Sequence, residues 1–195
     1  AGELVGQILL AERIFAARLS NVVFMGIGEP FDNYDAVLKC VRIINDKDGL
    51  NIGARRITIS TCGIIPGIER LATEGIQVEL SVSLHAATDE LRSKLMPVNR
   101  TYPLAPLLTA CKVYFEATKR IITFEYILIK GVNDAPEQAK ELARLLKKTP
   151  GRVNLIPLSP VEEFDGKPAT EMAAETFAYI LQNNGVNSTI RRSKG

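Results

Sequence analysis

Hydrophobic positions along this chain alternate between the spacing of amphipathic helices and that of buried strands. Apolar residues that recur every three or four positions predict helices over residues 2–19, 33–46, 66–73, 89–95, 104–119, 136–148 and 171–183. Short runs rich in apolar and β-branched residues predict strands over 21–27, 56–61, 77–84, 121–129, 152–158 and 187–192. Because helices and strands alternate along the whole chain, the pattern favours an α/β fold with a parallel sheet covered by helices.

Polar residues within the predicted strands help to choose between the folds that share this pattern. Alternate residues of a strand face opposite sides of the sheet, and several of these strands have one apolar face and one polar face. The polar-face residues are Thr58, Ser60, Glu79, Ser81, Ser83, His85, Thr123, Glu125 and Asn154. A doubly wound sheet buries both faces of its central strands, whereas a partial β/α barrel turns one face toward a wet cavity. We therefore predict a partial barrel; isolated hydrogen-bonded polar residues in an ordinary α/β core are the alternative.

The C-terminal ends of the predicted strands carry the candidate chemistry, because barrels of this kind build their sites there. Glu29 follows two glycines and can accept hydrogen bonds from an ammonium group. Serine hydroxyls could hold a carboxylate or a ribose, and Asn154 can donate and accept toward a heterocycle. A strand-to-helix turn explains the Gly-rich motif nearly as well, and a lone histidine is more often structural than catalytic. The candidates are Gly26, Gly28, Glu29, Ser60, Ser83, Leu84, His85 and Asn154.

Composition and charge narrow the possibilities only slightly. A chain of 195 residues that is 46% hydrophobic and 24% charged is typical of a folded domain, and it contains no apolar run long enough for a transmembrane helix. Cys40, Cys62 and Cys111 are too far apart for a metal-binding motif, so we predict no metal site and a reducing, cytoplasmic location. We expect Glu79 and Glu125 to pair with Arg56 or another base.

Basic residues occur in several small groups, although the net charge of +2 permits a nucleic-acid partner without requiring one. We interpret most of these groups, including Arg92 with Lys94, as solvated surface. Arg100, Arg191 and Arg192 follow strand ends near the predicted site and are the candidate RNA contacts.

Seven motifs, in order along the chain, resemble those of one family. They are GIGEP at 26–30 with NY at 33–34, ISTCGIIPGI at 59–68, SLHA at 83–86, DELRSKLMPVN at 89–99, FEYIL at 124–128 with GVND at 131–134, VNLIP at 153–157 and RRSKG at 191–195. Together they resemble the radical SAM adenine methyltransferases of large-subunit ribosomal RNA. The partial β/α barrel of that family agrees with the fold predicted from strand parity.

The resemblance implies a cofactor, an activity and roles for the candidate residues. S-adenosylmethionine would lie in the barrel, with Gly28 and Glu29 receiving its methionine amino group and Ser60, Ser83, Leu84, His85 and Asn154 making other contacts. The implied reaction uses a 4Fe-4S cluster and a methyl-carrying cysteine to methylate carbon 2 of an adenosine in large-subunit ribosomal RNA, with transfer RNA as a further candidate substrate. Carbon-8 methylation within the same superfamily, and a non-catalytic barrel that binds S-adenosylmethionine or RNA, are the alternatives.

Three parts of the family's pattern are missing from this sequence. The CxxxCxxC cluster loop with its preceding first strand would lie upstream of the 2–19 helix, the methyl-carrying cysteine would follow residue 195, and the N-terminal RNA-binding domain is also missing. We therefore expect residues 1–195 to be the barrel core of a longer, monomeric enzyme, unable by itself to hold the cluster or turn over. The expected partners are ribosomal RNA, transfer RNA and an electron donor for the cluster, with no membrane.

Overall fold

A computed structural model describes residues 1–159 and 164–191 and contains one sheet of parallel strands. The strands are β1 (Val22–Phe24), β2 (Ile57–Thr61), β3 (Glu79–Ser83), β4 (Ile122–Leu128), β5 (Gly151–Pro157) and β6 (Ser188–Ile190). The helices are α1 (Gly2–Phe15), α2 (Tyr34–Asn45), α3 (Ile65–Thr73), α4 (Asp89–Leu95), α5 (Leu104–Thr118), α6 (Pro136–Leu146) and α7 (Glu171–Asn183). Short 3₁₀ helices form at Pro30–Asn33, Ala54–Arg56 and Pro97–Arg100.

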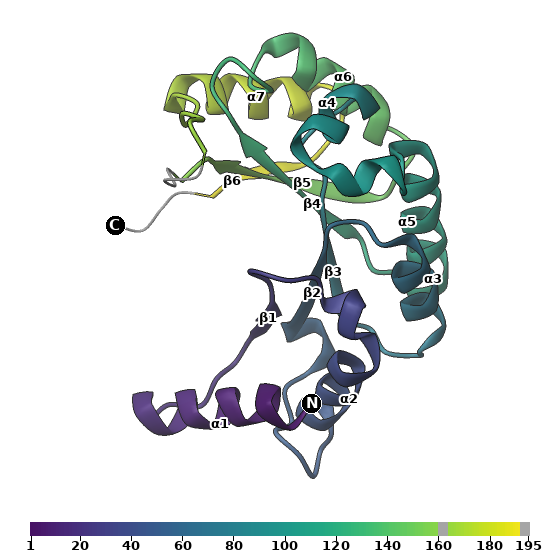
Figure 1. The fold of residues 1–195 in the computed structure, drawn as a ribbon, viewed down its shortest axis with the longest axis vertical. Coiled ribbons are helices and arrows are strands. Elements are labelled where there is room, and N and C mark those ends of the chain that lie inside the picture. The colour runs from purple at the N-terminus through teal and green to yellow at the C-terminus, as the bar shows by residue number, and fades with distance from the viewer. Residues whose placement is uncertain (160–163, 192–195) are drawn as a thin grey trace.

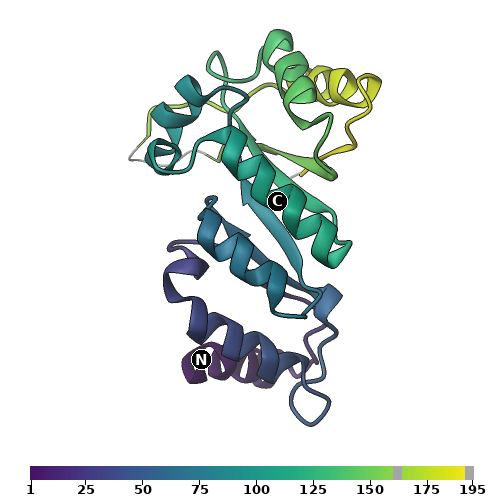
Figure 2. The ribbon, with the colours of Figure 1, turned by 90° about the vertical axis from the view of Figure 1, so that its right-hand side faces the viewer.

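The strands lie side by side in their order along the chain, from β1 to β6. A doubly wound sheet reverses its strand order at a switch point, whereas sequential right-handed crossovers place the connecting helices on one face. The sheet curls into an open arc, with α2 to α7 on its outer side and α1 at the end beside β1 (Figures 1 and 2). The predicted partial barrel is therefore confirmed, and the doubly wound alternative is wrong.

The strand register separates the two faces of the sheet as the parity of the sequence predicted. Ser60 pairs with Ser81, and Glu125 lies between Ser83 on β3 and Asn154 on β5, so the polar residues share one face. The other face is apolar and packs under the helices. Its fully buried members include Ile57, Leu80, Val82, Phe124, Val153 and Leu155.

Several element boundaries differ from the prediction, and backbone geometry explains the differences. The first helix ends at Phe15 instead of residue 19, because Ala16 adopts a left-handed conformation with φ 46°. The first strand ends at Phe24, because Gly26, with φ 137°, turns the chain out of the extended conformation. The helix predicted from residue 33 is preceded by a 3₁₀ turn, whose Phe31 N–H donates to the Glu29 carboxylate at 3.0 Å.

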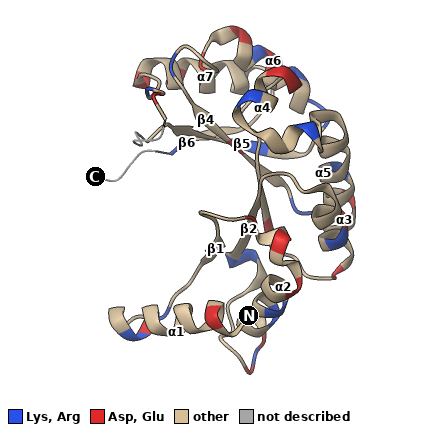
Figure 3. Cartoon of the chain, in the orientation of Figure 1, with Lys and Arg blue, Asp and Glu red and all other residues tan. Residues whose placement is uncertain are grey.

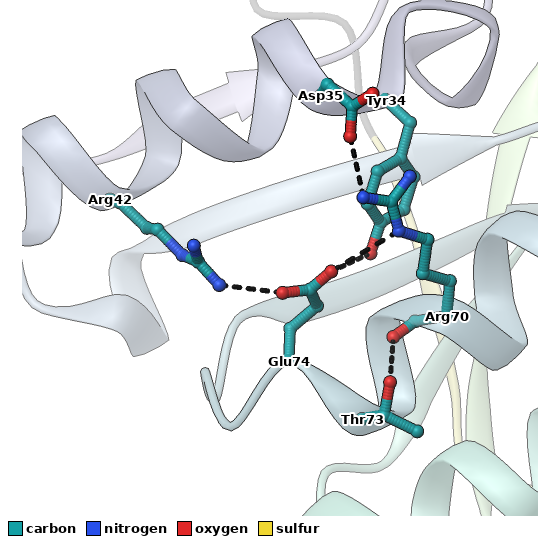
Figure 4. Close-up of polar contacts among 6 residues, drawn as sticks. All are labelled: Tyr34, Asp35, Arg42, Arg70, Thr73 and Glu74. Atoms are coloured by element: carbon teal, nitrogen blue, oxygen red, sulfur yellow. Dashed lines mark hydrogen bonds and ion pairs between the residues drawn. The ribbon is translucent and has the colours of Figure 1, made fainter.

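A network of charged side chains joins α2 to α3 on the outer side of the sheet (Figure 4). Arg70 donates to Asp35 at 2.6 Å, and its guanidinium lies 4.1 Å from the centroid of the Tyr34 ring. Glu74 accepts from the Tyr34 hydroxyl at 3.2 Å and from Arg42 at 2.7 Å. Exposed ion pairs such as Arg70–Asp35 add little stability. The network nevertheless holds the first residue of α2, just beyond the 3₁₀ turn, against the end of α3.

Candidate functional site

A cavity of about 850 Å³ lies on the polar side of the sheet; α1, β1 and the loop after β1 line one part of it, and the C-terminal ends of β2, β3 and β4 line the other. This volume lies in the range of small-molecule and cofactor sites. The predicted cofactor contacts Gly28, Glu29, Ser60, Ser83 and His85 all line it, together with Cys62, Glu125 and Ile127. Residues from four separate strand ends therefore meet around one hollow.

The loop after β1 supplies one wall of the cavity. Gly26 and Gly28 have φ of 137° and 99°, and a Cβ added at either would meet nothing within 4 Å. Their peptide groups are therefore free of side-chain cover on this wall. The Glu29 carboxylate accepts from Phe31 N–H at 3.0 Å and, through its other oxygen, from Cys62 N–H at 2.7 Å. An ionised carboxylate can accept about four hydrogen bonds, so Glu29 ties the loop to β2 and keeps acceptor capacity for a ligand ammonium.

His85 enters the cavity wall directly after β3, with a left-handed φ of 59°. Its Nδ1 accepts from the Ile127 N–H at 3.1 Å, so the neutral ring carries its proton on Nε2. Burial, together with the charge of Arg92, lowers the pKa of His85 to about 4. The imidazole is therefore neutral at pH 7 and presents a hydrogen-bond donor instead of a positive charge.

Leu84 and Asn154, the other two predicted contacts, are not among the residues that line the cavity. The Leu84 side chain is fully buried in the core, and its carbonyl accepts from Arg92 Nε at 3.2 Å. The Asn154 amide donates to the Glu125 carboxylate at 2.8 Å and accepts from the Thr189 hydroxyl at 3.2 Å. Asn154 therefore adjoins the cavity through Glu125.

The expected pairing of the two strand carboxylates with Arg56 or another base is confirmed for Glu79 and wrong for Glu125. Glu79 forms its ion pair with Arg120. Glu125 is 6% exposed and forms no ion pair with a described residue. Burial raises the pKa of Glu125 above its ordinary value, while the Asn154 hydrogen bond and the nearby charge of Arg191 act in the opposite direction. The expected pairing of Glu125 with a base is therefore wrong, because the carboxylate bonds instead to the neutral amide of Asn154 on β5.

Arg92, interpreted from the sequence as solvated, is fully buried behind the cavity. Its Nη2 donates to the carbonyl oxygens of Cys62 at 2.7 Å and Ser83 at 3.1 Å, which joins the ends of β2 and β3. Its Nη1 donates to the Asn99 side chain at 2.8 Å and to the Tyr102 carbonyl at 3.3 Å. Burial lowers the pKa of the Arg92 guanidinium. The sequence carried no local signal for this role, because every acceptor except one is a backbone carbonyl.

The candidate RNA contacts have separate locations. Arg100 is exposed at the end of the 3₁₀ helix Pro97–Arg100, and Arg191 is exposed directly after β6. Arg192 lies outside the described residues. Lys and Arg are interspersed with Asp and Glu along the outer helices of the described chain (Figure 3). The RNA-contact assignments therefore stay predictions.

The three cysteines do not fit an iron–sulfur cluster. Cys40 lies on α2, Cys62 follows β2 and Cys111 lies on α5. Burial raises the pKa of the Cys62 and Cys111 thiols to about 12. Within residues 1–159 and 164–191, no three His, Cys, Asp or Glu side chains lie close enough together to hold a metal ion.

Over the same described residues, every helix is too short or too polar to cross a membrane.

Comparison with known proteins identifies the family of this barrel. Residues 5–146 match the model of the radical SAM superfamily. The chain belongs to this superfamily. The superfamily part of the resemblance inferred from the sequence motifs is thus confirmed, and membership implies S-adenosylmethionine and a 4Fe-4S cluster in the full enzyme.

Individual radical SAM proteins match the whole chain. It is 54% identical to a probable dual-specificity RNA methyltransferase RlmN of Symbiobacterium thermophilum and 53% identical to one of Moorella thermoacetica. Each alignment covers 100% of this chain; the first covers 53% of the relative and the second 56%. The chain thus spans about half the length of these curated relatives. A crystal structure of a radical SAM methyltransferase from Sphaerobacter thermophilus superposes with a TM-score of 0.95 at 48% identity, over 100% of this chain and 58% of that one.

The fold extends to a protein of much lower sequence identity. A domain of pyruvate-formate lyase-activating enzyme from Bacteroides vulgatus superposes with a TM-score of 0.64 at 18% identity, over 89% of this chain and 100% of that domain. At this identity the likeness concerns the barrel alone.

Proposed function

We propose that residues 1–195 form the S-adenosylmethionine-binding barrel of a cytoplasmic radical SAM methyltransferase that modifies carbon 2 of an adenosine in large-subunit ribosomal RNA and in transfer RNA. The observation that carries the proposal is the convergence of Gly28, Glu29, Ser60, Ser83 and His85 on one cavity in a chain of this family. The similarity of the whole of this chain to about half the length of dual-specificity RNA methyltransferases supports the substrate class.

The lining residues match the chemistry of S-adenosylmethionine group by group. The Glu29 carboxylate and the open peptide of Gly28 suit the ammonium of its methionine end, because Glu29 retains unused acceptor capacity. The hydroxyls of Ser60 and Ser83 suit its carboxylate or ribose, and the Nε2–H of His85 suits an acceptor on the nucleoside.

Leu84 and Asn154 contribute to this site by their placement. Leu84 is anchored in the core between Ser83 and His85, and this fixes the spacing of the two cavity residues. The Asn154 amide bonds to Glu125, which lines the cavity. We assign Asn154 to the end of the cofactor that reaches Glu125.

S-adenosylmethionine, when bound, supplies the methyl group, and the cluster of the full enzyme supplies the electron for radical chemistry. The cluster ligands belong to another part of the enzyme, since the cysteines of this barrel do not fit a cluster, and we place the methyl-carrying cysteine and the RNA-binding domain outside residues 1–195 as well. The partners are then RNA and an electron donor, and the exposed Arg100 and Arg191, with Arg192, are the proposed RNA contacts. We expect a monomer.

The cofactor site is tested by Glu29→Gln in the full-length protein, with binding of S-adenosylmethionine measured by calorimetry. Loss of a charge-assisted hydrogen bond worth about 1.5–3 kcal/mol predicts roughly 10- to 150-fold weaker binding. Glu69→Gln is the matched control, because Glu69 is exposed on α3, away from the lining residues. Equal affinity in Glu29→Gln and the wild type would remove Glu29 from the site.

The reaction is tested by incubating the full-length, cluster-loaded protein with methyl-labelled S-adenosylmethionine and either ribosomal or transfer RNA. Mass spectrometry of the nucleosides then separates 2-methyladenosine from 8-methyladenosine. We expect the carbon-2 product. Exclusive carbon-8 product would favour the first alternative, and cofactor binding without any methylated nucleoside would favour a non-catalytic barrel.

A further inference from the structure

Asn133 is a fully buried polar residue that joins the ends of two strands beside the cavity. It lies in the loop after β4, and its Nδ2 donates to the carbonyl oxygens of His85 at 2.9 Å and Ile127 at 2.6 Å. Its Oδ1 accepts from the Ile129 N–H at 2.7 Å, and its own carbonyl accepts from the Tyr126 hydroxyl at 3.0 Å. Both polar atoms of the carboxamide are therefore engaged with backbone groups.

The carboxamide of Asn133 bonds to the backbone just beyond the last residue pair of β3 and β4. The β3–β4 ladder ends at the pair Ser83 and Glu125, and the N–H groups of Leu84 and His85 both turn to the Glu125 carbonyl, at 2.9 and 3.3 Å. His85 then adopts φ 59°, a left-handed conformation that is unfavourable for a non-glycine residue. Such a conformation persists only where the surroundings hold it, and the Asn133 hydrogen bond to the His85 carbonyl does so.

The same contacts determine how the His85 ring is presented. Ile127 donates its N–H to His85 Nδ1, while the Ile127 carbonyl accepts from Asn133, so one residue links the ring to the carboxamide. His85 lines the cavity, and its Nε2 makes no hydrogen bond with any residue in the described part of the chain. The Nε2–H is therefore the one ring donor left for a ligand.

We propose that Asn133 is a positioning residue of the cofactor site: its carboxamide holds the His85 backbone and the Ile127 peptide so that Nδ1 stays an acceptor and Nε2–H donates into the cavity. The inference rests on the proposed function for the identity of the ligand, whose nucleoside offers ring nitrogens and ribose oxygens as acceptors. Without the carboxamide, His85 is free to leave its left-handed conformation, and the ring loses its fixed tautomer.

The tautomer is measured by nitrogen NMR of the full-length protein labelled with ¹⁵N-histidine. His85 is the only histidine of this chain, and its resonances are identified by their loss in His85→Gln. In the wild type we expect a protonated Nε2 and an unprotonated Nδ1; in Asn133→Ala we expect a mixture of tautomers. Tyr126→Phe is the matched control, because it removes a buried hydrogen bond to the Asn133 carbonyl and leaves the carboxamide in place. It should keep the wild-type tautomer.

Two results of this measurement would overturn the inference. One is a protonated Nδ1 in the wild type, which needs no variant; the other is a single wild-type tautomer in a folded Asn133→Ala protein. If Asn133→Ala fails to fold, the smaller hydroxyl variant Asn133→Ser is measured in its place against the same expectation.

Binding of S-adenosylmethionine to the same proteins separates this inference from the proposed function. In Asn133→Ala the hydrogen bond from His85 Nε2–H to the cofactor should be lost, which predicts about three- to tenfold weaker binding of S-adenosylmethionine. Tyr126→Phe should bind as the wild type does. Wild-type affinity in Asn133→Ala would overturn the positioning role while the proposed function stands. Absence of binding in the wild type would overturn the proposed function and the ligand named here, and the tautomer measurement would still decide what Asn133 does to His85.

Discussion

Replacing Arg92 with Met tests whether one buried cation holds the strand ends that carry the site. The methionine side chain is apolar and unbranched but shorter than that of arginine, so it fills the part of the space that the aliphatic stem occupied. What disappears is the set of hydrogen bonds to Cys62, Ser83 and Leu84 at the ends of β2 and β3, and to Asn99 and Tyr102. The bonds to Leu84 and Asn99 are fully buried, where water does not replace the lost donor, whereas those to Cys62, Ser83 and Tyr102 are partly buried.

Two opposing terms set the expected loss of stability. Each buried acceptor left without a donor costs about 1–3 kcal/mol, and several acceptors are affected at once. Removing a charge that is 0% exposed, with no carboxylate within ion-pair distance among the described residues, recovers several kcal/mol of desolvation. We therefore expect the free energy of unfolding to fall by about 2–4 kcal/mol, a large part of the 5–15 kcal/mol typical of a domain.

Urea denaturation of the 195-residue chain, followed by far-ultraviolet circular dichroism because the chain has no tryptophan, measures this difference. The control is Lys94→Met on the same helix. Lys94 pairs with Glu90 at 2.7 Å, with side-chain exposures of 67% and 82%, so its loss should cost at most about 0.5 kcal/mol. If Arg92→Met lowered the free energy of unfolding by no more than the control Lys94→Met does, Arg92 would not hold the strand ends.

Two further predictions concern the glycine on α3 and the acid stability of the barrel. A Cβ at Gly67 would lie 2.5 Å from the Phe31 ring, so Gly67→Ala should lower the free energy of unfolding by about 1–3 kcal/mol. Gly6 on α1 faces open space, so Gly6→Ala should raise the free energy of unfolding by about 0.5–1 kcal/mol. Urea titrations in which both variants change the free energy of unfolding in the same direction would contradict this. The pKa of His85 is lowered from 6.5 to about 4 in the folded chain. Between these two pH values the unfolded chain binds a proton on His85 that the folded chain does not bind. The free energy of unfolding should therefore fall by up to about 3 kcal/mol as the pH drops from 6.5 to 4. Denaturation at a series of pH values should show that His85→Gln removes this component, and identical slopes for variant and wild type would count against it.

The sequence alone determined the order and type of the elements and the division of the strands into two faces. Both follow from local periodicity: the spacing of Leu80, Val82 and Leu84 is visible without knowing which strand lies beside them. The ends of the strands could also be located, which brought Glu29, Ser60, Ser83 and His85 into one candidate site before their neighbours were known. Individual ends moved where a single residue, such as Ala16 or Gly26, left the regular conformation.

Only the tertiary structure decided which polar residues are exposed, which are buried and what they bond to. Arg92 stands two positions from the exposed Lys94 and looks solvated in the sequence, yet backbone carbonyls from distant parts of the chain surround it. Asn133 was no candidate in the sequence, and Glu125 was expected to form an ion pair; the curled sheet places His85 beside the first and Asn154 beside the second. Periodicity is a property of neighbours along the chain, whereas a hydrogen-bond partner is a property of neighbours in space, and any carbonyl group can accept. These assignments therefore required the three-dimensional arrangement of the strands and their loops.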